Sequence, residues 1–192
     1  MKIATATELA VDTTPQPRYT MGVTRNLDCN TKKGQKFIES QRETGWLIER
    51  LFHVVVKHTA DDAEKFDCHI YRGGLIGLGE IKTRPYFNRK LKTTCTLDRL
   101  RREGYLITAE KLDILREHSI KSRVTSYLFV NLPNDRKLLV FKISNGRGSF
   151  FTNFERRRTT TKYSCNDYKG DTIRENAFIP IEGNKHFKSY DY

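Results

Sequence analysis

The chain has 192 residues and a formal net charge of +12, from 35 Lys+Arg against 23 Asp+Glu. Such a length suits one domain with extensions and can bury a core without disulfides or metals. No apolar run approaches the roughly 20 residues of a membrane span, and residues 1–12 make a poor signal peptide. The four cysteines are widely spaced and form no C-x-x-C pair, which argues against a disulfide framework or a zinc site. We therefore expect a cytoplasmic protein with reduced thiols and no membrane partner.

The positive charge is concentrated in two segments. Residues 82–123 hold twelve Lys/Arg and five Asp/Glu, a net charge of +7. Residues 142–162 hold six Lys/Arg and one Glu, a net charge of +5, so the rest of the chain is neutral. Two basic segments favour a polyanionic partner, with nucleic acid as the first candidate. From charge alone, a solvated surface is an equal alternative.

The first half of the chain predicts an arm, a helix, a short strand and a hairpin. The arm is rich in proline and threonine, and the apolar residues after it recur at helical spacing. A segment of alternating polarity follows, and then a Gly73-Gly74 dipeptide that is typical of a two-residue hairpin turn. In chain order the expected elements are an irregular arm over 1–33, a helix over 35–50, and strands over 52–57, 65–72 and 75–83.

The second half predicts further helices and strands around a basic loop. Thr108 suits the N-cap of a helix, and the Pro133-Asn134-Asp135 run suits a turn between two strands. Beyond Asn145 the sequence has no clear period, and only loops and one more strand are expected. In chain order we expect a basic loop over 86–104 with a short helix near 97–102, a helix over 108–120, and strands over 124–130 and 137–143. The domain organisation expected is an arm (1–33), a core (34–145) and a basic C-terminal extension (146–192) packed on the same domain.

The hairpin register brings three charged residues together. If Gly73 and Gly74 form the turn, Asp67 lies directly opposite Glu80, and Lys82 lies on the same face two residues further along. Like charges directly opposite destabilise a sheet, so their repulsion must be offset. Mg²⁺ would do so because it prefers carboxylate oxygens and waters, and it can activate water for attack on a phosphate. The plainer alternative is a solvent-facing ion cluster of the same three side chains.

These residues resemble the motif of the PD-(D/E)XK nuclease superfamily. Asp67 and the Glu80-Ile81-Lys82 run, preceded by a helix and followed by a helix and a strand, are similar to its α-β-β-β-α-β core over roughly residues 35–144. The resemblance implies an α/β (α+β) fold with a restriction-endonuclease-like core, a central mixed β-sheet flanked by helices. It also implies a Mg²⁺-dependent endodeoxyribonuclease in which Mn²⁺ can substitute. The motif's proline is absent, since Phe66 precedes Asp67.

The resemblance assigns roles to individual residues. Asp67, Glu80 and the backbone carbonyl of Ile81 would hold the metal, and Lys82 would be the catalytic lysine. Members of the family often add a Glu from the first helix. In order of fit, the candidates for that carboxylate are Glu43, Glu39 and Glu49.

Basic residues near the hairpin are the expected contacts to DNA phosphates. The expected contacts are Arg84, Arg89, Lys90, Lys92, Lys111, Arg156, Arg157 and Arg158. For Lys111 the alternative is a solvated lysine in the first turn of a helix, and Trp46 on the first helix is expected in the core. Two other functions stay open, a ribonuclease and a nucleic-acid-binding module without catalysis. A homodimer would suit an enzyme that cuts both strands of a duplex.

Overall fold

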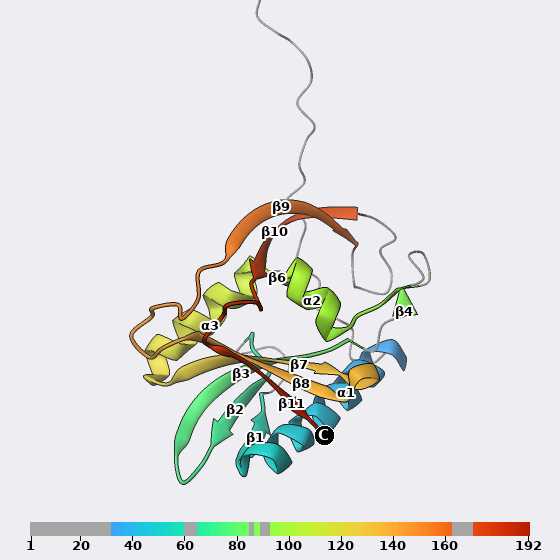
Figure 1. Cartoon of the computed structure of the whole chain (residues 1–192). Coiled ribbons are helices and arrows are strands. Elements are labelled where there is room, and N and C mark those ends of the chain that lie inside the picture. Colours follow the sequence, from blue (N-terminus) through green and yellow to red (C-terminus); the bar gives the residue numbers. More distant parts are fainter. Residues whose placement is uncertain (1–31, 60–64, 85–86, 89–92, 163–170) are drawn as a thin grey trace, which may run out of the picture.

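The computed structural model describes residues 32–59, 65–84, 87–88, 93–162 and 171–192 (Figure 1). The predicted arm up to residue 31, and the predicted contacts Arg89, Lys90 and Lys92, lie outside these residues. In chain order the elements are α1 (Lys32–Phe52), β1 (Val55–His58), β2 (Cys68–Tyr71), β3 (Leu75–Thr83), β4 (Phe87–Asn88), β5 (Thr93–Thr94), α2 (Leu97–Glu103), β6 (Tyr105–Thr108), α3 (Ala109–Ser122), β7 (Thr125–Leu132), the 3-10 turn η1 (Pro133–Asp135), β8 (Lys137–Ser144), β9 (Glu155–Lys162), β10 (Asp171–Ile179) and β11 (Phe187–Asp191).

The fold is mixed α/β around a six-stranded sheet with the strand order β1-β2-β3-β7-β8-β11. Strands β3 and β7 are parallel, and the other neighbours are antiparallel. Helix α1 covers one face of this sheet, and α2 and α3 cover the other (Figure 1). The predicted mixed sheet flanked by helices is therefore confirmed. Among the helices of the described residues, none is long and apolar enough to cross a membrane.

Helix α1 packs on the sheet through a stripe that excludes its tryptophan. Thr44, Leu47 and Ile48 are buried at helical spacing, whereas Trp46 is 69% exposed. The expectation that Trp46 lies in the core is wrong, because position 46 falls on the opposite side of the helix from this stripe. The helix ends where His53 adopts a left-handed conformation with φ of 52°.

The body of the β2–β3 hairpin has the predicted register. The paired residues are Cys68 and Gly79, His69 and Leu78, and Ile70 and Gly77. The Asp67 N–H donates to the Gly79 carbonyl at 3.1 Å, which continues the pairing one step toward Glu80. Asp67 and Glu80 therefore lie on adjacent strand segments, as the register predicted.

The turn of this hairpin differs from the two-residue turn expected. Tyr71 pairs with Leu75, so the turn has three residues, and Gly73 takes a φ of 69° that favours glycine. The register then shifts by one residue, which leaves Ile76 as a bulge. The three-residue turn shifts the pairing by one residue relative to the predicted register, and the bulge at Ile76 shifts it back. From the pair Ile70 and Gly77 onward, the register is therefore the predicted one.

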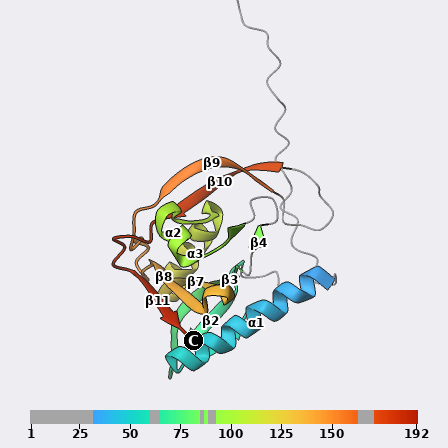
Figure 2. The same cartoon turned by 45° about the vertical axis from the view of Figure 1, so that its right-hand side comes forward.

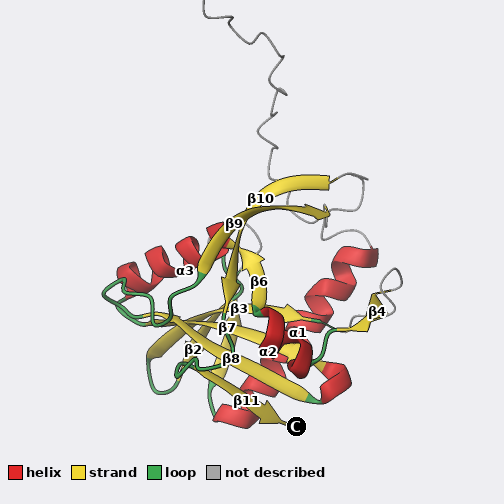
Figure 3. Cartoon of the chain, turned by 45° about the horizontal axis from the view of Figure 1, so that its top comes forward, coloured by secondary structure: helices red, strands yellow, loops and turns green. Residues whose placement is uncertain are grey.

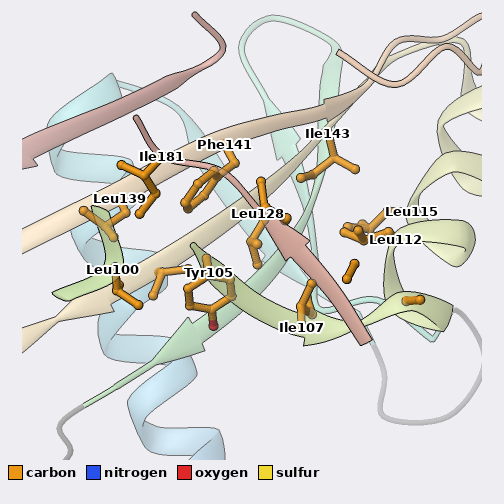
Figure 4. Close-up of a cluster of buried hydrophobic side chains, with 14 of the residues drawn as sticks. Leu100, Tyr105, Ile107, Leu112, Leu115, Leu128, Leu139, Phe141, Ile143 and Ile181 are labelled. Atoms are coloured by element: carbon orange, nitrogen blue, oxygen red, sulfur yellow. The ribbon is translucent and has the colours of Figure 1, made fainter. Parts of the chain in front are cut away.

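The main core lies between the sheet and the elements over its second face (Figure 4). Leu112 and Leu115 of α3 pack against Leu128 and Phe141 of the sheet. Strand β6 adds Tyr105, which is 2% exposed, although the sequence predicted a loop up to residue 104 and no strand before the helix. A four-residue strand gives too short an alternation to be recognised.

The C-terminal region completes both sheets. Strand β10 lies between β6 and β9 in a three-stranded sheet that arches over α2 and α3 (Figures 2 and 3). Strand β11 adds to the edge of the central sheet beside β8. The sequence predicted only one strand here. Strand β9 has no apolar alternation because, at the edge of its sheet, the side chains of residues 155–158 are exposed.

Candidate active site

Three elements bring charged side chains together at the C-terminal end of β3. Asp67 directly precedes β2, Glu80 and Lys82 lie on β3 between β2 and β7, and Lys111 lies in the first turn of α3. Glu80 and Lys82 point to the α3 side of the sheet, since both alternate with Ile81, which packs against α1. The site is thus built on the rigid centre of the sheet.

The ammonium group of Lys82 lies where the predicted metal donors converge. Its Nζ is 2.5 Å from Glu80 Oε1, 3.4 Å from Asp67 Oδ2 and 3.2 Å from the Ile81 carbonyl oxygen. All three donors are hard oxygens, which Mg²⁺ prefers and completes with waters. Within the described residues no three His, Cys, Asp or Glu side chains form a metal-binding group. The oxygens that could hold a divalent cation here are those of two carboxylates and one backbone carbonyl.

Glu80 is a fully buried carboxylate with two cations beside it. Its side chain is 0% exposed, and its Oε1 is 3.3 Å from Lys111 Nζ as well as 2.5 Å from Lys82 Nζ. Among the described residues this oxygen has no hydrogen-bond partner of normal geometry, so ion pairing alone compensates it. Burying an isolated carboxylate is costly, and the two lysines offset that cost. Asp67 and Lys82 remain 15% and 25% exposed, so the cluster opens to solvent on their side and only Glu80 is fully buried.

Lys111 is a member of the site. Its Nζ donates to the Lys65 carbonyl oxygen at 3.0 Å and lies near both carboxylate oxygens of Glu80. Lys111 is a first-turn lysine that stays 35% exposed but pairs with Glu80 within the chain. The contact could not be predicted from sequence, because it depends on how α3 is placed against β3.

Two opposing effects act on the pKa of Lys82. Burial lowers this pKa, but the negative charges of Glu80 and Asp67 outweigh burial and raise it above the ordinary lysine value. The ammonium group therefore stays protonated at neutral and mildly alkaline pH. Asp67 is itself held in place because its Oδ2 accepts a hydrogen bond from the Ile81 N–H at 2.7 Å.

His58, at the end of β1, interacts with Asp67 and was not predicted as part of the site. A side chain at Gly45 of α1 would put its Cβ 2.7 Å from His58 Nε2, so glycine allows the imidazole to approach the helix. Burial lowers the pKa of His58, although Asp67 and Glu49 act to raise it. No signal in the sequence identified His58, because its place opposite Cys68, the neighbour of Asp67, depends on the pairing of β1 with β2.

The structure does not bring the predicted first-helix carboxylate to this cluster. Glu43 and Glu39 are exposed on the side of α1 that carries Trp46. Thr44 takes the inward position instead, with its Oγ1 3.1 Å from Thr83 Oγ1. Glu49 is nearer to the sheet, where its Oε1 accepts a hydrogen bond from the backbone N–H of Val56 at 2.8 Å.

Two arginines of the predicted DNA-contacting run are engaged within the chain. Arg156 forms an ion pair with Asp113 of α3, with 2.6 Å between Nη2 and Oδ1. Arg157 pairs with Glu155 and stacks over the ring of Phe178, 4.4 Å from its centroid. Arg158 is exposed on β9. The charge of residues 156–158 is therefore partly neutralised within the chain.

Arg84 directly follows β3 and packs against Tyr105. Its guanidinium carbon lies 5.6 Å from the centroid of the Tyr105 ring. Among the described residues the buried Tyr105 hydroxyl has no hydrogen-bond partner. Burial raises the pKa of this hydroxyl, while the charges of Arg84 and Lys82 act to lower it. The first basic segment of the sequence, residues 82–123, thus begins at the cluster itself.

No family model, no curated protein and no solved structure matches this chain.

Proposed function

We propose that this chain is a metal-dependent nuclease that hydrolyses DNA phosphodiester bonds. The observation that carries the proposal is the buried Glu80 carboxylate, which meets Asp67 and the Ile81 carbonyl around a single cationic group. A buried carboxylate of this kind costs folding energy, and such perturbed clusters are concentrated at functional sites.

The order of elements supports the resemblance to PD-(D/E)XK nucleases. Helix α1 precedes three antiparallel strands, β1 to β3, and α3 then precedes β7, which is parallel to β3. This order agrees with the α-β-β-β-α-β core that the resemblance implies, with the elements from β4 to β6 inserted before α3. Asp67, Glu80 and Lys82 occupy the hairpin positions that the motif requires.

A divalent cation fits the oxygen donors of Asp67, Glu80 and Ile81. When bound, Mg²⁺ or Mn²⁺ would lower the pKa of a bound water and neutralise negative charge on the phosphate. Glu80 lies on β3 and Asp67 directly precedes β2, so the hairpin fixes the separation of the two carboxylates.

The lysines supply positive charge that the fold holds in place. Lys82 stays protonated and can stabilise the negative charge that develops on the scissile phosphate or orient the attacking water. Lys111 provides a second cation for Glu80, so this carboxylate keeps a counter-ion if Lys82 turns toward a substrate. The Ile81 N–H holds the Asp67 carboxylate against β3. These roles need no movement of the backbone.

A plasmid assay tests the proposal. Supercoiled DNA is incubated with wild type, Asp67→Asn and, as a matched control, Asp98→Asn, whose carboxylate is 79% exposed on α2. In Mg²⁺ or Mn²⁺ we expect nicked or linear products from wild type and the control. We expect none in EDTA or from Asp67→Asn, which should still bind DNA in a mobility-shift assay because the basic segments are unchanged.

The same assay separates the alternatives. Cleavage by Asp67→Asn at the wild-type rate, or cleavage in EDTA, would contradict the proposed site. Cleavage of an RNA duplex but not of DNA would indicate a ribonuclease. Metal-independent binding without cleavage of either substrate would indicate a binding module on a nuclease-like fold.

A further inference from the structure

A groove lies on the α1 side of the central sheet, at the opposite end of β3 from the charged cluster. Its volume is about 530 Å³, within the range of small-molecule sites. Ile70, Ile76, Phe129 and Val140 of the sheet form an apolar floor. Ile76 is 42% exposed, so part of this floor is open to solvent. The groove is thus separate from Asp67, Glu80 and Lys82.

The rim of this groove is basic. Arg72, Lys142, Lys185, His186 and Lys188 line it, and none of the described residues that line it is Asp or Glu. Arg72 directly follows β2 and Lys142 lies on β8. Lys185 and His186 directly precede β11, and Lys188 lies on β11. An apolar floor inside a rim of one charge sign is complementary to a molecule with an apolar body and an anionic head.

The rim is held in place by contacts within the chain. The Arg72 guanidinium donates to the Phe52 carbonyl oxygen, which ties the end of β2 to the end of α1. The Lys142 N–H donates to the His186 carbonyl oxygen at 2.9 Å. The rings of Phe52 and Tyr190 meet edge to face, with centroids 4.8 Å apart. The groove is therefore formed without a ligand.

We infer that this groove binds an amphipathic anion, with a hydrocarbon body on the floor and a carboxylate-type head at the rim. The rings of Phe129, Tyr127 and Tyr190 also line the groove, so a nucleotide whose base stacks on them is the competing occupant that the test includes. Arg72, Lys142 and Lys188 offer charge-assisted hydrogen bonds to an anionic head. This inference does not depend on the proposed nuclease function.

Calorimetric titration with dodecanoate below its micellar range tests the inference on the full chain. We expect one saturable site for dodecanoate and no comparable site for dodecyltrimethylammonium or thymidine monophosphate. The double variant Lys142→Glu/Lys188→Glu should weaken binding roughly tenfold, since it reverses two exposed rim charges. The matched control Lys121→Glu, on the exposed side of α3, should bind like wild type.

Methyl NMR spectra recorded during the titration locate the bound chain. We expect shifts at Ile70, Ile76 and Val140 in wild type and in Asp67→Asn alike. Equal binding of the cationic detergent would show a non-selective apolar surface and overturn the inference. Absence of saturation, shifts elsewhere, or tighter binding of the nucleotide would also overturn it, whatever the plasmid assay shows.

Discussion

Two buried polar clusters lie on opposite faces of the end of β3, and they are built differently. On the α1 face, Thr44 Oγ1 lies 3.1 Å from Thr83 Oγ1, and Asn131 Nδ2 donates to Thr44 Oγ1 at 3.2 Å. Tyr192 OH then donates to Asn131 Oδ1 at 2.7 Å. On the α3 face, the buried carboxylate of Glu80 is compensated by lysine ammonium groups. One cluster is neutral and hydrogen-bonded, and the other is ionic.

The difference indicates which cluster serves the fold. Neutral hydrogen bonds between buried groups contribute modestly to stability, and breaking them leaves unsatisfied atoms that cost more. A buried ion pair gives little stability compared with an uncharged replacement of similar volume. The sheet therefore does not require Glu80 and Lys82 in order to fold, whereas it does benefit from the network around Thr44. This contrast can be tested one face at a time.

The largest expected effect comes from removing the ionic pair as a unit. In the double variant Glu80→Gln/Lys82→Met we expect cleavage to fall on the order of 1,000-fold or more. The free energy of unfolding should stay the same or rise by roughly 1–4 kcal/mol, because the buried charge of Glu80 and the partly buried charge of Lys82 are replaced together. Urea unfolding and the plasmid assay measure the two quantities.

A second pair serves as the control for this double variant. Lys137→Met/Asp191→Asn removes an ion pair whose aspartate is 81% exposed, and it should change neither quantity appreciably. A decrease of several kcal/mol in the free energy of unfolding of the Glu80→Gln/Lys82→Met variant would show that the ionic cluster stabilises the fold. The two faces would then not differ in their contribution to stability.

The next effect concerns the charge of Lys82. Lys82→Met alone should slow cleavage roughly 100-fold. Burial lowers the pKa of Lys82, but the charges of Glu80 and Asp67 raise it by more than burial lowers it. The net pKa is therefore above the ordinary value of 10.5. Because the folded pKa exceeds the unfolded one, the stabilisation is complete below about pH 10.5 and is lost as the pH rises through the folded value.

A pH series checks this sign. Above pH 10.5 the free energy of unfolding should fall more steeply for wild type than for Lys82→Met. Between pH 7 and pH 10 the wild-type rate of cleavage should show no fall that depends on Lys82. An alkaline decrease near pH 8 to 9 that is missing from the variant would mean that Lys82 titrates there, contrary to the ion pairs described.

The ionic cluster was predictable in part because strand pairing is local. The polarity pattern around Asp67 and the Gly73-Gly74 turn placed Asp67 beside Glu80, although the turn has three residues. The bulge at Ile76 cancels that error, and nothing in the sequence marks it. Register within one hairpin depends on neighbouring residues, so it can be inferred from a sequence.

Contacts between distant elements could not be inferred in the same way. The approach of Lys111 to Glu80 depends on how α3 packs on the sheet. The side of α1 that faces the sheet depends on the rotation of the helix about its axis. The sequence therefore predicts Trp46 in the core and Glu43 at the site, whereas in the structure Thr44 points inward. Strand β9 lacks an apolar alternation because it is an exposed edge.

In the neutral cluster on the α1 face, Thr44→Val should reduce stability and leave cleavage nearly unchanged. The substitution keeps the shape of the side chain but leaves Asn131 Nδ2 without its Thr44 partner, so we expect a loss of roughly 1–3 kcal/mol in the free energy of unfolding. Cleavage at a temperature where the variant is folded should stay within about twofold of wild type, since no charge near the cluster changes. Thr160→Val, at an exposed position on β9, is the matched control and should leave stability nearly unchanged. A large loss of cleavage by folded Thr44→Val would show that the two faces are coupled.

The smallest effect is expected at Glu43, which tests how far the resemblance to PD-(D/E)XK nucleases extends. Its side chain is exposed beside Trp46, so Glu43→Gln should leave both stability and cleavage unchanged. Glu49→Gln is the informative comparison, because Glu49 accepts a hydrogen bond from the Val56 N–H and its charge acts on His58, next to Asp67. We expect a modest decrease in cleavage for Glu49→Gln and none for Glu43→Gln, measured by initial rates of plasmid nicking. The reverse order would contradict the placement of Glu43, which is exposed beside Trp46 and away from the charged cluster.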